Sequence, residues 1–78
     1  SGNAEMLFNM LQDLDEEFEG QVDVCLANVE VNQSLAEQYG ISEVPTTLII
    51  NNGEVVDYFP GMLSKGRIRQ KIEALLVY

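Results

Sequence analysis

The chain has 78 residues, of which 46% are hydrophobic, so it can form one small domain and is too apolar to be disordered. No apolar run approaches the roughly 20 residues of a membrane-spanning helix, and a net charge of −9 repels phosphate backbones, so we expect neither membrane nor nucleic acid as a partner. A single cysteine and no histidine exclude an intrachain disulfide, zinc or copper sites and histidine-based catalysis, so we expect no metal and no cofactor.

The first predicted element is an amphipathic helix from about Asn3 to Glu19, closed by Gly20. Its apolar stripe has helical spacing and consists of Leu7, Leu11, Leu14 and Phe18. Five acidic residues crowd the last turns, where the helix dipole disfavours them, so we interpret that face as one that favours solubility.

The next segment, Gln21–Val31, is a nearly continuous apolar run and predicts an interior parallel strand covered on both faces. It contains Cys25. A buried thiol is usually an inert small hydrophobe with a raised pKa, and a reactive role is the alternative.

A short helix is predicted over Gln33–Tyr39, with Asn32 as its N-cap and Gly40 as the residue that ends it. Its spacing turns three side chains toward the core, those of Leu35, Ala36 and Tyr39.

A buried strand, Thr46–Asn51, follows. Val44 is forced out of helical geometry by the proline after it, and Pro45 cannot donate to a sheet ladder, so Pro45 should begin the strand. From these residues alone a trans Val44–Pro45 bond is the commoner state, and a cis bond stays open.

Asn52-Gly53 between apolar runs predicts a tight hairpin to an antiparallel strand, Val55–Phe59. After Pro60-Gly61, Ser64 should cap a closing helix whose stripe is Ile68, Ile72, Leu75 and Leu76. All four basic residues fall here, at Lys65, Arg67, Arg69 and Lys71. We interpret them as a solvated helix face; a docking site for acidic ligands is the alternative.

The order helix, strand, helix, strand, strand, helix is that of an α/β domain. The chain resembles the second part of a thioredoxin, without a gap from Ser1 to Leu76. The most specific matches are Gly40-Ile41, Val44-Pro45-Thr46, Asn52-Gly53-Glu54 and the segment from Gly61 to Gly66. The resemblance implies a partial thioredoxin-like fold in which Pro45 is cis and its loop binds substrate peptide.

Ser1-Gly2-Asn3-Ala4 falls on the Cys-Gly-Pro-Cys motif of this family. Ser1 and Ala4 therefore mark, in altered form, the catalytic positions of the attacking and the resolving cysteine. Neither residue can take part in thiol–disulfide exchange, and Leu26 replaces a strand lysine that often assists proton movement in the family. We expect the chain to be redox-inactive as written.

The opening strand, helix and strand of the family are missing, including the strand that would lie between the two strands predicted to be parallel. Its removal leaves a gap of about 10 Å, two strand spacings, and exposed edges. A separate segment can fill the gap, the two strands can pair directly, or a second chain or copy can insert an element. We favour the first alternative, so residues 1–78 are expected to be a domain lacking its N-terminal strand–helix–strand.

The resemblance implies the class of thiol–disulfide oxidoreductases, with protein or peptide substrates, a role in redox homeostasis and a cytoplasmic location. The alternative is a non-catalytic module that binds peptides through the proline groove. The peptide-binding residues implied are Val29, Val44, Pro45, Thr46, Gly61 and Met62, with Pro60 beside them. A third alternative is a structural subunit in which these residues only pack.

Overall fold

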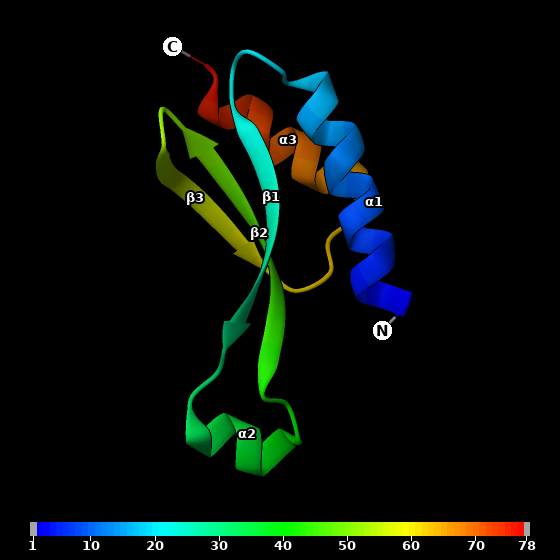
Figure 1. Cartoon of the computed structure of the whole chain (residues 1–78), viewed down its shortest axis with the longest axis vertical. Coiled ribbons are helices and arrows are strands. Elements are labelled where there is room, and N and C mark those ends of the chain that lie inside the picture. Colours follow the sequence, from blue (N-terminus) through cyan, green and yellow to red (C-terminus); the bar gives the residue numbers. More distant parts are fainter. Residues whose placement is uncertain (1, 78) are drawn as a thin grey trace.

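The computed structural model describes residues 2–77, which confirm the predicted element order and the α/β class (Figure 1). None of the helices in this range is long and apolar enough to cross a membrane. The elements are α1 (Gly2–Glu17), β1 (Asp23–Glu30), α2 (Gln33–Tyr39), β2 (Glu43–Asn51), β3 (Glu54–Pro60) and α3 (Lys65–Leu75).

The core lies between one face of the sheet and the helices α1 and α3. Both predicted stripes supply it, because a helix stabilises the fold by burying its apolar face. The exception is Leu75, which was predicted in the stripe of α3 and is exposed. Ser64 caps α3 as predicted, and its hydroxyl accepts a hydrogen bond from the Arg67 N–H at 3.1 Å. The buried apolar side chains are Leu7, Leu11, Leu14, Phe18, Val22, Val24, Ile49, Phe59, Ile68 and Ile72.

The sheet has the order β1-β2-β3, and both neighbouring pairs are antiparallel. The predicted hairpin is confirmed: Asn52 and Gly53 have φ values of 53° and 78°, the positive angles that a type I′ turn requires. Leu26, Thr47 and Phe59 lie opposite one another across the three strands.

Two expectations for β1 were wrong. It is an edge strand that pairs directly with β2, antiparallel to it, rather than an interior parallel strand. Among the described residues the two strands pair directly, which is the second of the three alternatives. The favoured alternative concerns a segment outside these residues and stays a prediction. A free edge on each strand would leave backbone groups unpaired, and closing the gap satisfies them.

The expected cis bond at Pro45 is also corrected: the described residues contain no cis peptide bond. The physical reason lies in the sheet. Strand β2 begins at Glu43, three residues earlier than predicted, and Glu43, Val44 and Pro45 pair with Glu30, Val29 and Asn28. The ladder therefore runs extended through the proline.

Helix α2 has the predicted bounds and caps. The Asn32 side chain accepts a hydrogen bond from the Leu35 N–H at 2.9 Å, and Gly40 ends the helix with φ of 67°. The predicted packing is wrong, because no α2 residue is buried, and Leu35 and Tyr39 are 41% and 62% exposed. Direct pairing of β1 with β2 carries α2 to the far end of their ladder, away from α1 and α3 (Figure 1).

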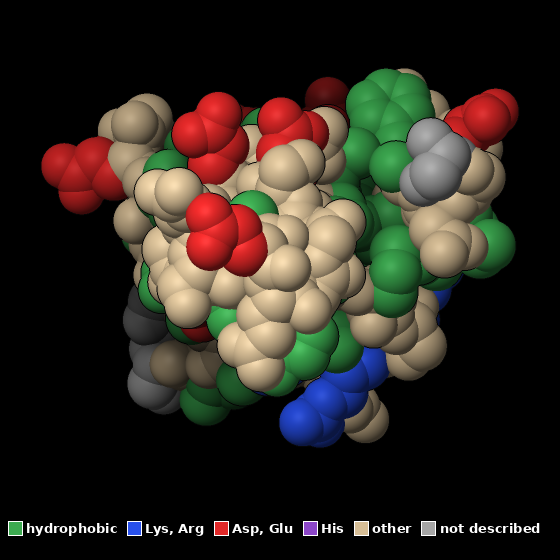
Figure 2. Space-filling model, turned by 90° about the horizontal axis from the view of Figure 1, so that it is seen from below, with side chains coloured by type: hydrophobic (Ala, Val, Ile, Leu, Met, Phe, Trp, Pro, Cys, Tyr) green, Lys and Arg blue, Asp and Glu red, His purple; other side chains and the backbone are tan. Residues whose placement is uncertain are grey.

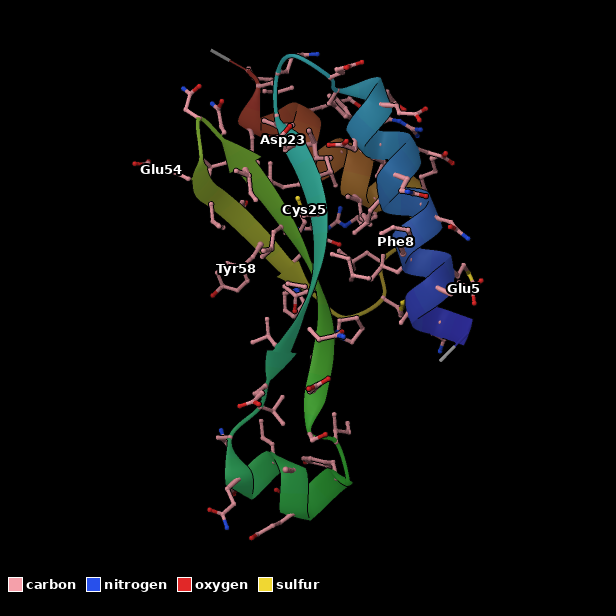
Figure 3. The ribbon with its side chains drawn as sticks, viewed as in Figure 1. Glu5, Phe8, Asp23, Cys25, Glu54 and Tyr58 are labelled. Atoms are coloured by element: carbon pink, nitrogen blue, oxygen red, sulfur yellow. The ribbon has the colours of Figure 1, made fainter. Side chains whose placement is uncertain are left out.

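The sheet face opposite the helices is open. Cys25, Leu48 and Tyr58 lie side by side across the three strands on this face. Tyr58 is 64% exposed and points away from α1 and α3 (Figure 3). The structure thus leaves a partly apolar face uncovered.

Two ion pairs join α1 to α3. Lys65 Nζ lies 2.9 Å from Asp13, and the Arg69 guanidinium donates two hydrogen bonds to Glu17, at 2.7 and 3.0 Å. The basic face of α3 was predicted to be solvated. Two of its four basic residues, Lys65 and Arg69, instead link α3 to α1.

We expect the pKa of Glu17 to lie below its ordinary value, because Arg69 hydrogen-bonds to the charged carboxylate and attracts it. Arg69→Gln should raise this pKa toward the ordinary value in a carboxyl-detected NMR titration. Since the pKa is lower in the folded state, the pair stabilises the fold above the unfolded-state pKa. That contribution is lost as the pH falls through the folded-state pKa.

Arg67→Gln is the matched control, because it removes the same charge from the same helix without touching this pair. An unchanged Glu17 titration in Arg69→Gln would show that the ion pair does not form in solution.

Candidate functional site

A cleft of about 630 Å³ lies where the start of α1 approaches the β2 proline and the β3–α3 connection. Figure 2 views the molecule from the side of α2, and hydrophobic side chains gather there between α2 and α1. The cleft is lined by Asn3, Ala4, Asn28, Ile41, Glu43, Pro45, Gly61 and Met62. It therefore brings together four regions that are distant in the sequence.

Asn3 and Ala4 lie in the first turn of the 16-residue helix α1. Ser1 lies outside the described residues. The N-terminus of a helix stabilises negative charge, so a thiol at position 4 or just before it would have a lowered pKa. Ala4 has no thiol, so this position lies at a helix N-terminus without sulfur chemistry.

Pro45 and Gly61 both line the cleft and are joined by a backbone hydrogen bond. The Gly61 N–H donates to the Pro45 carbonyl at 2.8 Å, and Gly61 adopts φ of 84°, an angle that favours glycine and lets the chain leave β3. The next residue, Met62, is 41% exposed and lines the same cleft. The structure therefore brings Ala4, Pro45, Gly61 and Met62 together.

The other predicted binding residues do not line the cleft. Thr46 is 1% exposed, and its hydroxyl donates to the Val44 carbonyl at 3.1 Å, which fixes the chain beside Pro45. Val44 pairs with Val29 in the β1–β2 ladder. The Val44 backbone expected to bind an extended peptide thus faces β1 in this structure.

Four residues of the cleft were not predicted as site residues. Ile41 and Glu43 belong to the segment before the proline, and Asn3 belongs to the motif, so proximity in sequence was an available signal. Asn28 had no such signal. It reaches the cleft because it lies opposite Pro45 in a ladder whose direction the sequence did not predict.

Cys25 lies away from the cleft, half-buried on the open face of the sheet. Its burial raises the pKa of the thiol, and the nearby Asp15 and Asp23 carboxylates raise it further. At neutral pH this keeps the sulfur protonated, which suits the inert interpretation.

A smaller hollow of about 270 Å³ lies at the opposite end of the sheet, between the α1–β1 loop and the β2–β3 turn. No predicted site residue lines it. Within residues 2–77, no group of three or more Cys, Asp or Glu side chains is placed to hold a metal ion.

Comparisons with known proteins agree with the geometry. The thioredoxin family model matches residues 2–74. Over 72 residues, or 92% of this chain, the sequence is 40% identical to a thioredoxin of Chlorobaculum thiosulfatiphilum and 31% identical to thioredoxin 1 of Nostoc. A thioredoxin of Haemophilus influenzae is 37% identical over 67 residues, 86% of the chain.

The chain spans about two thirds of the length of these relatives, 67% of the first two and 63% of the third. No solved structure matches it. With a family match over nearly all of its residues and a cleft where the family's motif meets its proline loop, this chain belongs to the thioredoxin family.

Proposed function

We propose that the chain is a domain of the thiol–disulfide oxidoreductase class whose redox centre is altered, so that it is redox-inactive as it stands. The observation that carries the proposal is the cleft that Ala4 shares with Pro45 and Gly61. The expected partners are proteins or peptides, and the expected location is the cytoplasm, where an unpaired cysteine such as Cys25 is ordinary.

The chemistry of the class explains both the cleft and the inactivity. A thiolate at position 1 would attack a substrate disulfide, forming a mixed disulfide and releasing one substrate thiolate. A thiol at position 4 would then attack, lose its proton, form the intrachain disulfide and release the second thiolate, so the substrate is reduced and the dithiol oxidised. Ser1 cannot form the mixed disulfide, and Ala4 cannot resolve it.

The inactive state is tested with the chain as it stands. We expect it to leave the rate of insulin reduction by dithiothreitol unchanged, because the protonated Cys25 lies outside the cleft. A Cys25→Ala variant is the control. If the chain accelerates the reaction and Cys25→Ala does not, Cys25 is reactive and the proposal that the chain is inactive is wrong.

The second candidate is a binding module that uses the same cleft without redox chemistry. The lining favours it, because Ile41, Pro45 and Met62 offer apolar surface to a peptide side chain. Titration with an unlabelled peptide should shift the amide NMR signals of Ala4, Val44, Thr46, Gly61 and Met62. Shifts confined to the α1–β1 loop or to α3 would contradict it.

Main-chain pairing of a peptide with Val44 requires β1 to move, since Val29 lies opposite Val44 here. We propose that a strand–helix–strand of the same protein, outside residues 1–78, inserts between β1 and β2 and covers the open sheet face. Its support is that the relatives extend beyond the matched region by about a third of their length.

A fusion tests this directly. The corresponding segment of the Chlorobaculum thiosulfatiphilum relative, joined before Ser1, should remove the cross-strand NOEs between Leu26 and Thr47 and raise the urea midpoint. Retention of those NOEs in the folded fusion would contradict insertion. A change from monomer to dimer would point instead to a second copy.

A further inference from the structure

Among the eight residues that line the cleft, Glu43 alone is charged. It is exposed, and it lies on the Pro45 side of the cleft, two residues before the proline. A peptide that docks against Pro45 and Met62 therefore lies in a cleft that also contains a carboxylate.

A second carboxylate lies directly across the ladder from the first. Glu30 pairs with Glu43 in the β1–β2 register, and Glu30 is also exposed. Like charges opposite one another destabilise a sheet pair. The end of the ladder beside the cleft thus concentrates negative charge.

No basic residue offsets these acids within the described part of the chain. All four lysines and arginines lie between Lys65 and Lys71, and two of them, Lys65 and Arg69, form ion pairs with α1. Figure 2 shows acidic side chains around the α2 end that faces the viewer, with Lys and Arg toward the lower side. The negative charge at the cleft is therefore available to a ligand.

We propose that, in the chain as it stands with β1 paired to β2, Glu43, reinforced by Glu30, determines specificity by selecting peptides that carry Lys or Arg next to the segment docked in the cleft. This inference rests on the proposed function, because it concerns what the same cleft prefers. The pairing is solvent-exposed, so the expected preference is moderate, about three- to tenfold in affinity between matched basic and acidic peptides, and it should weaken with salt.

The test uses two short synthetic peptides that share a central apolar segment and differ only in flanking residues, two lysines in one and two glutamates in the other. Both are titrated into the labelled chain at low ionic strength and followed by amide NMR shifts. The lysine peptide should bind more tightly, with shifts at Gly61 and Met62. Glu43→Gln should remove most of the difference.

Glu54→Gln is the matched control. It removes the same charge from an exposed position at the β2–β3 turn, at the opposite end of the sheet from α2 (Figure 3), and should leave the preference unchanged. Equal loss of preference in both variants would mean that the net charge of −9 is responsible, which overturns the inference.

The outcomes separate the two claims. If both peptides shift the cleft residues with equal affinity, the specificity role of Glu43 is overturned and the binding site stands. If neither peptide shifts the cleft residues, the binding-module candidate fails, and this inference fails with it.

Discussion

Cysteines at positions 1 and 4 are expected to turn the chain into a dithiol-dependent insulin reductase. The Ser1→Cys/Ala4→Cys variant adds one thiol in the first turn of α1, at position 4, and one three residues earlier in the sequence, and the N-terminus of a helix lowers the pKa of a nearby thiol. At neutral pH a thiol with a lowered pKa has a larger thiolate fraction than an ordinary thiol, which is thiolate only to a few per cent. The rate of alkylation of the introduced thiols should therefore be roughly tenfold or more above the rate for Cys25.

Single variants separate the two roles. Ser1→Cys alone should form a mixed disulfide with substrate that persists, because no second thiol resolves it, and Ala4→Cys alone should give slow turnover. All variants are compared in a Cys25→Ala background, and each must retain the urea midpoint of the parent. A folded double variant without reductase activity would end the oxidoreductase proposal and leave the binding module.

Leu14→Ala is expected to destabilise the chain by about 2–5 kcal/mol, since it removes a fully buried side chain and leaves a cavity. A small domain has only about 5–15 kcal/mol in total. The variant should therefore lose a large part of its stability, with a lower urea midpoint and a largely unchanged slope if unfolding stays two-state.

Leu35→Ala is the matched control, the same truncation on a helix whose residues are not buried. It should shift the urea midpoint only slightly, because exposed substitutions usually change stability by less than about 0.5 kcal/mol. A loss comparable to that of Leu14→Ala would show that α2 packs against the body of the protein. It would contradict the extended β1–β2 ladder.

Local chemistry predicted the elements well. Asn52-Gly53 predicted the hairpin because both residues tolerate positive φ, and Asn32, Gly40 and Ser64 predicted caps that the structure shows. The apolar stripes of α1 and α3 also predicted most of the core, because helical spacing places their side chains on one face of each helix.

Long-range pairing was not predictable in the same way. A continuous apolar run such as that around Cys25 fits a buried strand but carries no information about the direction or identity of its partner. The family resemblance supplied a partner strand that these residues do not contain. The errors at β1, at α2 and at Pro45 all follow from that one difference in pairing.

The sequence predicted some of the residues that line the candidate cleft, and their function stays a prediction. Ala4, Pro45, Gly61 and Met62 converge in one cleft, as the motif and proline loop of the family imply. Glu43 was overlooked although it precedes that proline by two residues, because its significance depends on Glu30 across the ladder. Charge at a site depends on neighbours in space, and sequence order shows only some of them.

The central claim, that the start of α1 and the proline loop form one cleft, is tested most directly by a paramagnetic label. A nitroxide on Asn3→Cys in a Cys25→Ala background should broaden the amide signals of Val44, Thr46, Gly61 and Met62 and spare Asn52 and Gly53. A label on Glu54→Cys should do the reverse. If the Asn3 label leaves the amides around Pro45 and Gly61 sharp, the two regions do not meet and the account is wrong.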